Sequence, residues 1–438
     1  VVLEHDGRPL SLDNDVVFSM IGREAPLEFF RRSGIRIAGE WTPGRIAGLA
    51  AFLAFCFALY NWKSGGFLEH WHRAWGGFPF DLADRLAAAE PGSLLDVLRI
   101  SASGPAFYYT LAYSALVAIF GVRRIRRRRT PYVTVQTVTL IAVQVVPLFL
   151  LPEILLPWLD ARGWLPRWLA DPLFPAVDYG HGREFWRAYG LILAWPLNVY
   201  NVFTDSPNFA WLVICFLQTF VAIPAMIYFW GKGAYCGWIC SCGALAETLG
   251  DTHRHKMPHG PRFNRLNLAG QLILAVAFVL LALRILSWTF PEADALRRFN
   301  SMALWQSNLG WKWVVDVLLA GIVGYGVYFW YSGRVWCRFF CPLAALMHLY
   351  ARFSRFRILA DKKKCISCNV CTSVCHQGID VMNFANKGLP MGDPECVRCS
   401  ACVGACPTGV LTFGQVGRDG RVLGTDRLAA SAVRLSER

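Results

Sequence analysis

Six long apolar runs constrain the fold of this chain more than any other feature of its sequence. Each run approaches the ~20 residues that an α-helix needs to cross the hydrocarbon core of a bilayer. A lipid-exposed segment must satisfy its own backbone hydrogen bonds, so we expect each run to be a helix. The predicted spans are Arg45 to Trp62, Gly104 to Val122, Val133 to Leu159, Phe209 to Gly231, Leu268 to Phe290 and Trp311 to Tyr331.

A further apolar stretch, from Ala188 to Phe203, is short and is interrupted by Pro196 and two asparagines. We expect an interfacial or re-entrant segment there, because non-helical backbone at membrane depth is tolerated when protein surrounds it.

The composition agrees with a membrane protein that carries a small soluble part. The chain has 438 residues, of which 55% are hydrophobic and 17% are charged. Its formal net charge of +14 could indicate nucleic-acid binding. The basic residues lie beside the apolar runs, however, which is typical of the positive-inside bias of membrane proteins. We therefore predict a lipid bilayer, and no nucleic acid, among the partners.

Arginines in the short loops predict the orientation. The run from Arg123 to Arg129 follows the second span and is expected to face the cytoplasm. Counting from it, both termini are cytoplasmic, and so are the basic loops 232–265 and 332–364. The loops expected outside are 63–103, 160–208 and 291–310.

Eight cysteines near the end of the chain form two matched runs. Each run has the spacing C-x2-C-x2-C-x3-C, and the second continues into Pro407 where the first has His376. This is the bacterial pattern for two [4Fe–4S] clusters, in which the fourth cysteine of each run ligates the other cluster. Zinc and disulfide frameworks do not need this spacing twice. Cluster one is predicted on Cys365, Cys368, Cys371 and Cys406, and cluster two on Cys396, Cys399, Cys402 and Cys375.

Two more cysteine pairs follow the fourth and sixth spans, and each comes after a Phe-Trp dipeptide. The pairs are Cys236 with Cys240 and Cys337 with Cys341. Spacing i, i+4 would place both thiols of a pair on one helix face. Three interpretations remain open: buried free thiols, redox-active dithiols, or shared ligation of a third cluster. Cys242 is an additional thiol that could compete as a ligand.

The order of these motifs resembles the membrane polyferredoxins of the NosR and NapH type, over about Phe209 to Phe413. The first pair departs from that pattern, because Cys240 is followed by Ser241 where the family has proline. The resemblance implies electron transfer between a quinone pool or a flavin and a redox partner protein or respiratory complex subunit. It implies a multi-pass protein of the bacterial inner membrane, with the ferredoxin domain in the cytoplasm.

The segment from Asn14 to Pro26 resembles the C-terminal end of the nucleotide domain in thioredoxin-reductase-like flavoproteins. A cytoplasmic tail with one incidental strand is the alternative. The chain contains no GxGxxG motif. If the resemblance holds, the rest of an FAD and NAD(P)H domain is expected upstream of Val1.

The predicted fold class is an α-helical polytopic membrane protein with a C-terminal bacterial-type 2[4Fe–4S] ferredoxin domain of α+β type. We expect the end of a nucleotide- or flavin-type domain at 1–40, a transmembrane domain at 41–360, the ferredoxin domain at 361–413 and a flexible tail at 414–438. The predicted function is electron transfer from a flavin or NAD(P)H domain, or from quinol, through the clusters to a partner, as a component of an oxidoreductase. Two alternatives are a maturation factor that reduces a metal or cofactor of a respiratory enzyme and a redox sensor.

Overall fold

The computed structural model describes residues 2–5, 8–11, 27–35, 37, 40–82, 89–251, 257 and 261–426. The chain divides into two compact units, 1–48 and 49–438. In the first unit, strands β1 (Val2–His5) and β2 (Arg8–Ser11) pair as an antiparallel hairpin, and helix α1 covers Leu27–Arg32. The flavoprotein-like segment from Asn14 to Pro26 lies outside the described residues, so that resemblance stays a prediction.

Five helical stretches among the described residues are long and apolar enough to cross a membrane, and they coincide with the first five predicted spans. Large apolar side chains on their outer faces, such as Leu272 and Phe209, are exposed, as contact with lipid requires. The five stretches are Pro43–Lys63, Pro105–Arg128, Pro131–Ala161, Phe209–Trp230 and Phe263–Thr289.

The membrane part contains short helices between and within these stretches. In chain order the helices are α2 (Pro43–Lys63), α3 (Phe67–Trp75), α5 (Leu94–Ser101), α6 (Pro105–Arg128), α7 (Pro131–Val145), η1 (Val146–Leu155), α8 (Leu156–Ala161), α9 (Arg167–Leu173), η2 (Phe185–Leu191), α10 (Phe209–Phe216), η3 (Leu217–Ala222), α11 (Ile223–Trp230), α12 (Gly233–Cys236), α13 (Ser241–Glu247), η4 (Leu249–Asp251), α14 (Pro261–Arg265), α15 (Asn267–Thr289), α16 (Asp294–Ser301), η5 (Met302–Gln306), η6 (Lys312–Gly324), η7 (Trp336–Phe340) and α17 (Pro342–Ala351).

The sixth predicted span, Trp311 to Tyr331, is shorter and less regular than expected. The π-helix η6 covers 13 residues, and the chain continues through turns after residue 326. Glycines explain the change, because a Cβ at Gly321 would overlap the ring of Tyr60 and one at Gly326 would overlap Leu53. Close packing against α2 therefore takes the place of a regular helical surface.

The stretch from Ala188 to Phe203 is mostly buried in protein and mostly non-helical, while the prediction that it is interfacial or re-entrant stays a prediction. Ala194 and Val199 are fully buried. Two side chains from the middle of the fourth span donate hydrogen bonds to backbone carbonyls of this stretch. Thr219 Oγ1 donates to the carbonyl of Trp195 at 2.9 Å, and Gln218 Nε2 donates to the carbonyl of Leu191 at 2.9 Å. Protein groups thus satisfy this irregular backbone.

The ferredoxin domain has a three-stranded antiparallel sheet in the order β3-β4-β5. Its strands are β3 (Phe356–Ala360), β4 (Leu411–Val416) and β5 (Val422–Thr425), and its short helices are η8 (Lys362–Lys364), α18 (Val370–Ser373), α19 (Val381–Ala385) and α20 (Ala401–Ala405). Gly414 pairs with Thr425, so ordered strand structure continues beyond the predicted end at 413 and into the predicted tail. The reason is that β5 uses the free edge of β4. Residues 427–438 lie outside the described part of the chain.

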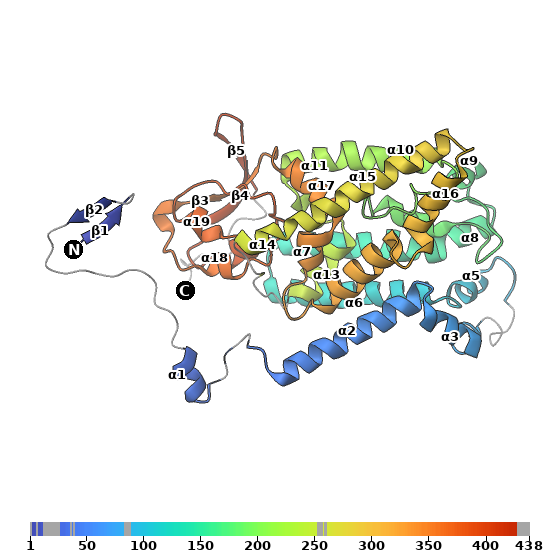
Figure 1. The fold of residues 1–438 in the computed structure, drawn as a ribbon, viewed down its shortest axis with the longest axis horizontal. Coiled ribbons are helices and arrows are strands. Elements are labelled where there is room, and N and C mark those ends of the chain that lie inside the picture. Colours follow the sequence, from blue (N-terminus) through green and yellow to red (C-terminus); the bar gives the residue numbers. More distant parts are fainter. Residues whose placement is uncertain are drawn as a thin grey trace. The chain divides into compact units, whose positions relative to one another are not determined.

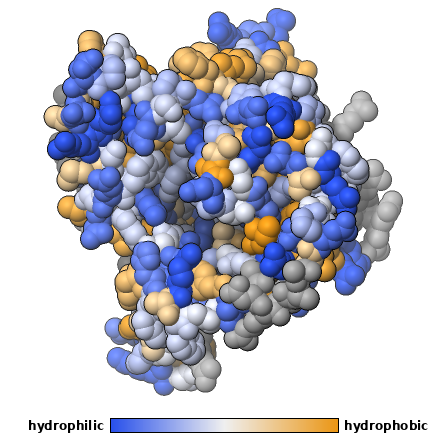
Figure 2. Space-filling model, turned by 90° about the vertical axis from the view of Figure 1, so that its right-hand side faces the viewer, coloured by the Kyte–Doolittle hydropathy of each residue, from blue (hydrophilic) through white to orange (hydrophobic). Residues whose placement is uncertain are grey.

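Within the second unit, the ferredoxin domain lies at the end of the bundle where α11 and α17 meet, while α8, α9 and α16 lie at the opposite end (Figure 1). The opposite end mixes hydrophilic residues with scattered apolar ones (Figure 2). The cysteine-rich parts of the chain are thus gathered at a single end of the membrane helices.

Candidate iron–sulfur sites

The two ferredoxin runs have the same unusual backbone. Ser367 and Asn369 flank Cys368 with φ of 52° and 60°, and Arg398 and Ser400 flank Cys399 with φ of 50° and 62°. Left-handed conformations are uncommon for residues other than glycine. Alternation between left- and right-handed residues turns successive N–H groups toward a common anion, as iron–sulfur sites require. Matched strain at matched positions indicates one ligand type for both loops.

The fold brings the predicted crossed sets of thiols together. Burial raises the pKa of Cys402 well above its usual range, and its neighbours Cys399, Cys396 and Cys375 raise it further. Burial likewise raises the pKa of Cys371, with added repulsion from Cys406 and Cys368. Cys375 therefore lies with the second run, and Cys406 with the first. The donor chemistry fits [4Fe–4S] clusters, and the individual ligand assignments stay predictions.

The two CxxxC pairs occupy equivalent helix junctions. Cys236 ends α12 and Cys337 lies in η7, while Cys240 and Cys341 are the N-cap residues of α13 and α17. Each pair thus spans a break between two helices and not one continuous helical face. At the second junction, the Ala344 amide donates to Cys341 Sγ at 3.4 Å. A helix N-terminus favours an anionic sulfur at such a position.

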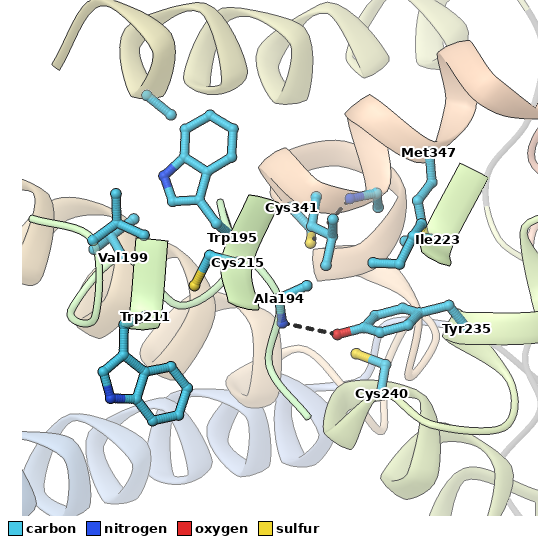
Figure 3. Close-up of a cluster of buried hydrophobic side chains, with 14 of the residues drawn as sticks. Ala194, Trp195, Val199, Trp211, Cys215, Ile223, Tyr235, Cys240, Cys341 and Met347 are labelled. Atoms are coloured by element: carbon cyan, nitrogen blue, oxygen red, sulfur yellow. Dashed lines mark hydrogen bonds between the residues drawn. The ribbon is translucent and has the colours of Figure 1, made fainter. Parts of the chain in front are cut away.

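The four pair cysteines (Cys236, Cys240, Cys337 and Cys341) converge into what we call the four-thiol site. All four are buried in one cluster of the membrane core. Figure 3 shows Cys240 and Cys341 there with Tyr235, whose hydroxyl accepts from the Ala194 amide of the re-entrant segment at 3.1 Å. Burial raises the pKa of Cys341 well above its usual range, and Cys337, Cys240 and Cys236 raise it further, so the four thiols are neighbours. Four neighbouring buried thiols would suit the third interpretation above, shared ligation of one more cluster, which stays a prediction.

Cys242 belongs to this site, and sequence reasoning identified it only as a possible competitor. Hydrogen bonds to Cys240 and Cys337 raise the pKa of Cys242 well above its usual range, so its thiol acts as the donor. The same bond from Cys242, assisted by the positive charges of Arg334 and Lys232, lowers the pKa of Cys337 to about 6 although burial opposes this. A thiolate at Cys337 is the form that binds iron.

A buried charge network adjoins both the four-thiol site and the second ferredoxin run. Glu247 accepts from Arg334 at 2.6 Å and from Arg124 at 3.0 Å, and all three side chains are almost fully buried. Arg334 also donates to the carbonyl of Cys236 at 3.1 Å. Glu247, His376 and Cys399 present ligand atoms within 4.8 Å of one another, a spacing that could hold a metal ion. Because Glu247 already pairs with two arginines, we interpret this group as a charge contact beside cluster two.

The loop that carries the second cysteine run packs directly against the segment that carries the four-thiol site. A Cβ at Gly233 would overlap the backbone of Val397 and the side chain of Arg398, and one at Gly237 would lie 2.9 Å from the Val397 carbonyl. Cys399 itself packs against the same buried cluster as the four thiols. Only glycine allows so close an approach. Sequence reasoning did not single out either glycine.

Ion pairs and hydrogen bonds stabilise the same contact between the ferredoxin domain and the membrane part. Glu395, which precedes Cys396, accepts from Lys232 at 2.8 Å and lies 2.8 Å from His348 Nδ1. Burial would raise its pKa, but Lys232 and His348 hold the pKa of Glu395 at about 2. Arg338 donates to the carbonyl of Gln377, and Tyr132 donates to that of Arg398 at 2.6 Å. The contacts come from α7, α12, η7 and α17, so the ferredoxin domain is built into the membrane part.

Family models match the three cysteine-bearing parts of the chain. The model of a 4Fe-4S dicluster domain matches residues 357–407, and the model of a 4Fe-4S binding domain matches both 209–258 and 315–359. The latter two stretches contain the CxxxC pairs, so the sequence similarity between the pairs extends to their helices. No solved structure matches the chain.

The curated relatives point the same way. The regulatory protein NosR of Stutzerimonas stutzeri is 28% identical over 204 residues, which cover 43% of this chain and 26% of NosR. The methylamine utilization ferredoxin-type protein MauN of Paracoccus denitrificans is 26% identical over 237 residues, covering 50% of this chain and 77% of MauN. MauN of Methylobacillus flagellatus is 28% identical over 157 residues, covering 35% and 52%.

The resemblance to membrane ferredoxins of the NosR/NapH type is confirmed. The chain has helices able to cross a membrane, stretches similar to 4Fe-4S binding domains and a C-terminal ferredoxin domain. The match spans about a quarter of NosR and about half of the Methylobacillus MauN.

Proposed function

We propose that the chain is a relay in which electrons move between the four-thiol site, cluster two and cluster one, in that order. One observation carries the proposal: the loop of cluster two is seated on the four-thiol segment at Gly233 and Gly237. A [4Fe–4S] cluster on each thiol set would supply one-electron chemistry. The contribution of the protein is to bury the sulfurs, to hold their hydrogen bonds and to fix their separation.

Cluster one is then the outer station of the relay. Cys368 is exposed, and its neighbour Ile366 is 63% exposed. Three exposed lysines, Lys362 to Lys364, directly precede Cys365 and add positive charge there. A redox protein with an acidic surface would be attracted there. We place this surface in the cytoplasm of a bacterial cell, because the arginine run 123–129 favours that side.

The donor at the membrane end is a quinol, or a flavin domain supplied by another part of a longer protein or by a partner. The quinol alternative is supported by the place of the four-thiol site at the ends of membrane helices. An upstream flavoprotein domain would favour NAD(P)H.

Magnetic coupling between reduced clusters tests the order of the sites. The holoprotein, purified without oxygen and reduced with dithionite, should give EPR signals broadened by coupling between neighbouring clusters. Cys341→Ala should remove the coupling at the membrane end and narrow the signal of cluster two, while cluster one keeps its coupling to cluster two. Narrowing of cluster one alone would reverse the order.

A regulatory role is the second candidate, because the NosR relative is named a regulatory protein. The two functions differ in flux. A relay in nanodiscs should sustain reduction of a soluble one-electron acceptor such as ferricyanide with a quinol or NAD(P)H supply, whereas a sensor should reduce it by one cluster equivalent and stop.

A further inference from the structure

A groove of about 700 Å³ lies between the sheet of the ferredoxin domain and the ends of two membrane helices. One wall comes from α7, α11 and the chain around α12, and the other comes from β3, β4 and β5. In Figure 1, β5 projects from the ferredoxin domain beside α11. The lining residues that the argument uses are Phe229, Trp230, Arg398, Phe413, Leu423 and Asp426. Because Trp230 is the last residue of α11, the groove lies where a membrane helix ends.

Exposed apolar side chains border the groove on both walls. Phe229 and Trp230 end the membrane-capable stretch Phe209–Trp230 and are 41% and 47% exposed. On the opposite wall, Leu423 and its neighbour Val422 are each 54% exposed, and every residue of β5 is exposed. Aromatic residues at a helix end are typical of the membrane interface, and a strand that exposes apolar side chains indicates a contact.

Apolar surface continues from the bilayer into the groove. Val213, Phe216 and Val221 are exposed along the same membrane-capable stretch, as contact with lipid requires. Phe229 and Trp230 belong both to the exposed surface of this stretch and to the wall of the groove. The hydrocarbon that covers α11 therefore reaches the groove without crossing a polar barrier.

Arginines belong to both walls. Arg398 lines the groove, where it pairs with Asp426 and lies with its guanidinium carbon 5.5 Å from the ring centroid of Phe413. Arg355 lies over the ring of Tyr228, the α11 residue before Phe229, at 4.8 Å from the centroid. Each wall thus carries a cation beside aromatic rings.

The turn between β4 and β5 adds two more arginines. Arg418 and Arg421 are exposed and precede Leu423 by five and two positions. Asp419 pairs with Arg421 at 3.5 Å in an exposed contact. Four arginines against two aspartates leave the groove and its hairpin with positive charge. Basic residues directly beyond the end of a membrane helix attract anionic lipids.

We propose that the groove binds an anionic phospholipid of the surrounding bilayer, with an acyl chain between Trp230 and Leu423 and the phosphate at the arginines of the hairpin. A phospholipid combines the apolar chain and the negative head group that this surface fits. The bound lipid would hold the β4–β5 hairpin at the membrane surface, in addition to the protein contacts at Gly233 and Glu395. The inference uses neither the clusters nor the order of electron transfer, so it is independent of the proposed relay.

Photocrosslinking from β5 tests the occupant in the intact protein. Benzoylphenylalanine replaces Leu423 in the holoprotein, which is irradiated in nanodiscs of equal parts phosphatidylglycerol and phosphatidylcholine and analysed by mass spectrometry. Phospholipid adducts are expected. Leu389 is the matched control, because it is 51% exposed in the same domain but does not line the groove. Benzoylphenylalanine at position 389 should give at least tenfold less lipid adduct.

Neutral substitutions in the hairpin turn test the head group. Wild-type surroundings should give mainly phosphatidylglycerol adducts from position 423. Arg418→Gln with Arg421→Gln should lower the ratio of phosphatidylglycerol to phosphatidylcholine adducts by about fivefold or more, since one cation near the membrane surface contributes about fivefold, or ~1 kcal/mol. Lys362→Gln with Lys363→Gln removes two exposed charges elsewhere in the domain and should leave the ratio unchanged.

Four results would overturn the proposal. They are the absence of lipid adducts at position 423, equal lipid labelling from positions 423 and 389, a protein adduct at 423 in place of lipid, and an unchanged lipid ratio in the double arginine variant. A protein adduct would show that another segment or a partner covers the groove. The visible absorbance of the clusters should match wild type in every variant, which shows that the fold is retained.

Discussion

At the scale of single residues, the most informative side chains are the sulfurs and the charges around them. Cys240 and Cys341 are the N-cap residues of α13 and α17, and the sulfur of Cys341 accepts a hydrogen bond from the Ala344 amide. Cys242 adds a thiol donor between the pairs, and Arg334 adds a positive charge beside Cys236 and Cys337. Each of these groups stabilises anionic sulfur in a dry site.

Iron content tests the four-thiol site. If it holds a cluster, anaerobically purified wild type should contain about twelve irons per chain, and Cys341→Ala about eight. Cys215→Ala removes a buried thiol of α10 that is not one of the predicted ligands, and should retain about twelve. Wild type with about eight irons would instead favour buried free thiols or a dithiol.

Cys242 is expected to act as a hydrogen-bond donor and not as a ligand. Cys242→Ala should therefore keep about twelve irons while the reduction potential of the membrane-end cluster falls, because hydrogen bonds to sulfur stabilise the reduced form. The measurement is iron analysis with an EPR-monitored redox titration. Loss of about four irons would show that Cys242 is a ligand.

The Glu395 contact tests how strongly the ferredoxin domain is held. Glu395→Gln removes a buried negative charge and leaves Lys232 uncompensated, which we expect to destabilise the protein by about 3 kcal/mol. Thermal or denaturant unfolding of the holoprotein measures this. Asp419→Asn, at an exposed ion pair with Arg421, should change stability by less than about 1 kcal/mol. Equal effects of the two variants would contradict the burial argument.

At the scale of elements, the seat between α12 and the loop of cluster two is the decisive contact. Much of its surroundings was predictable: the cysteine spacing indicated both ferredoxin loops and both helix-end pairs. The seat was not, because Gly233, Gly237 and Val397 are unremarkable in sequence and come together only when two distant segments pack. The i, i+4 argument for the pairs also misjudged the local structure, since spacing alone cannot reveal a helix break.

Two glycine-to-alanine variants, one at this contact and one away from it, distinguish the contact from a general effect of replacing glycine. Gly233→Ala inserts a Cβ into the seat, which should cost about 1–3 kcal/mol and weaken the magnetic coupling of cluster two to the membrane-end site. Gly404→Ala, where a Cβ meets nothing within 4 Å in helix α20, should leave stability and coupling unchanged or slightly increase stability. If the magnetic coupling of cluster two to the membrane-end site is unchanged in Gly233→Ala, the proposed order of the redox sites loses its support.

At the scale of the whole molecule, the open question with the largest consequence is orientation. The charge of the loops predicts that the ferredoxin domain faces the cytoplasm. A C-terminal fusion to green fluorescent protein should then fluoresce in a bacterial host, and the matched fusion to alkaline phosphatase should be inactive. Active phosphatase with a dark fluorescent fusion would place the clusters outside and reverse the relay.

The sequence by itself determined five of the membrane-capable helices and the similarity to 4Fe-4S domains, and it predicted the ligands and the electron-transfer function, because apolar run length and cysteine spacing are local patterns. Tertiary structure decided which sites adjoin. It packed the loop of the second cysteine run against Gly233 and Gly237, and it set Glu247 between arginines from α6 and from the loop before η7. Those relations join residues 87 or more positions apart, and only the packing of helices brings such residues into contact.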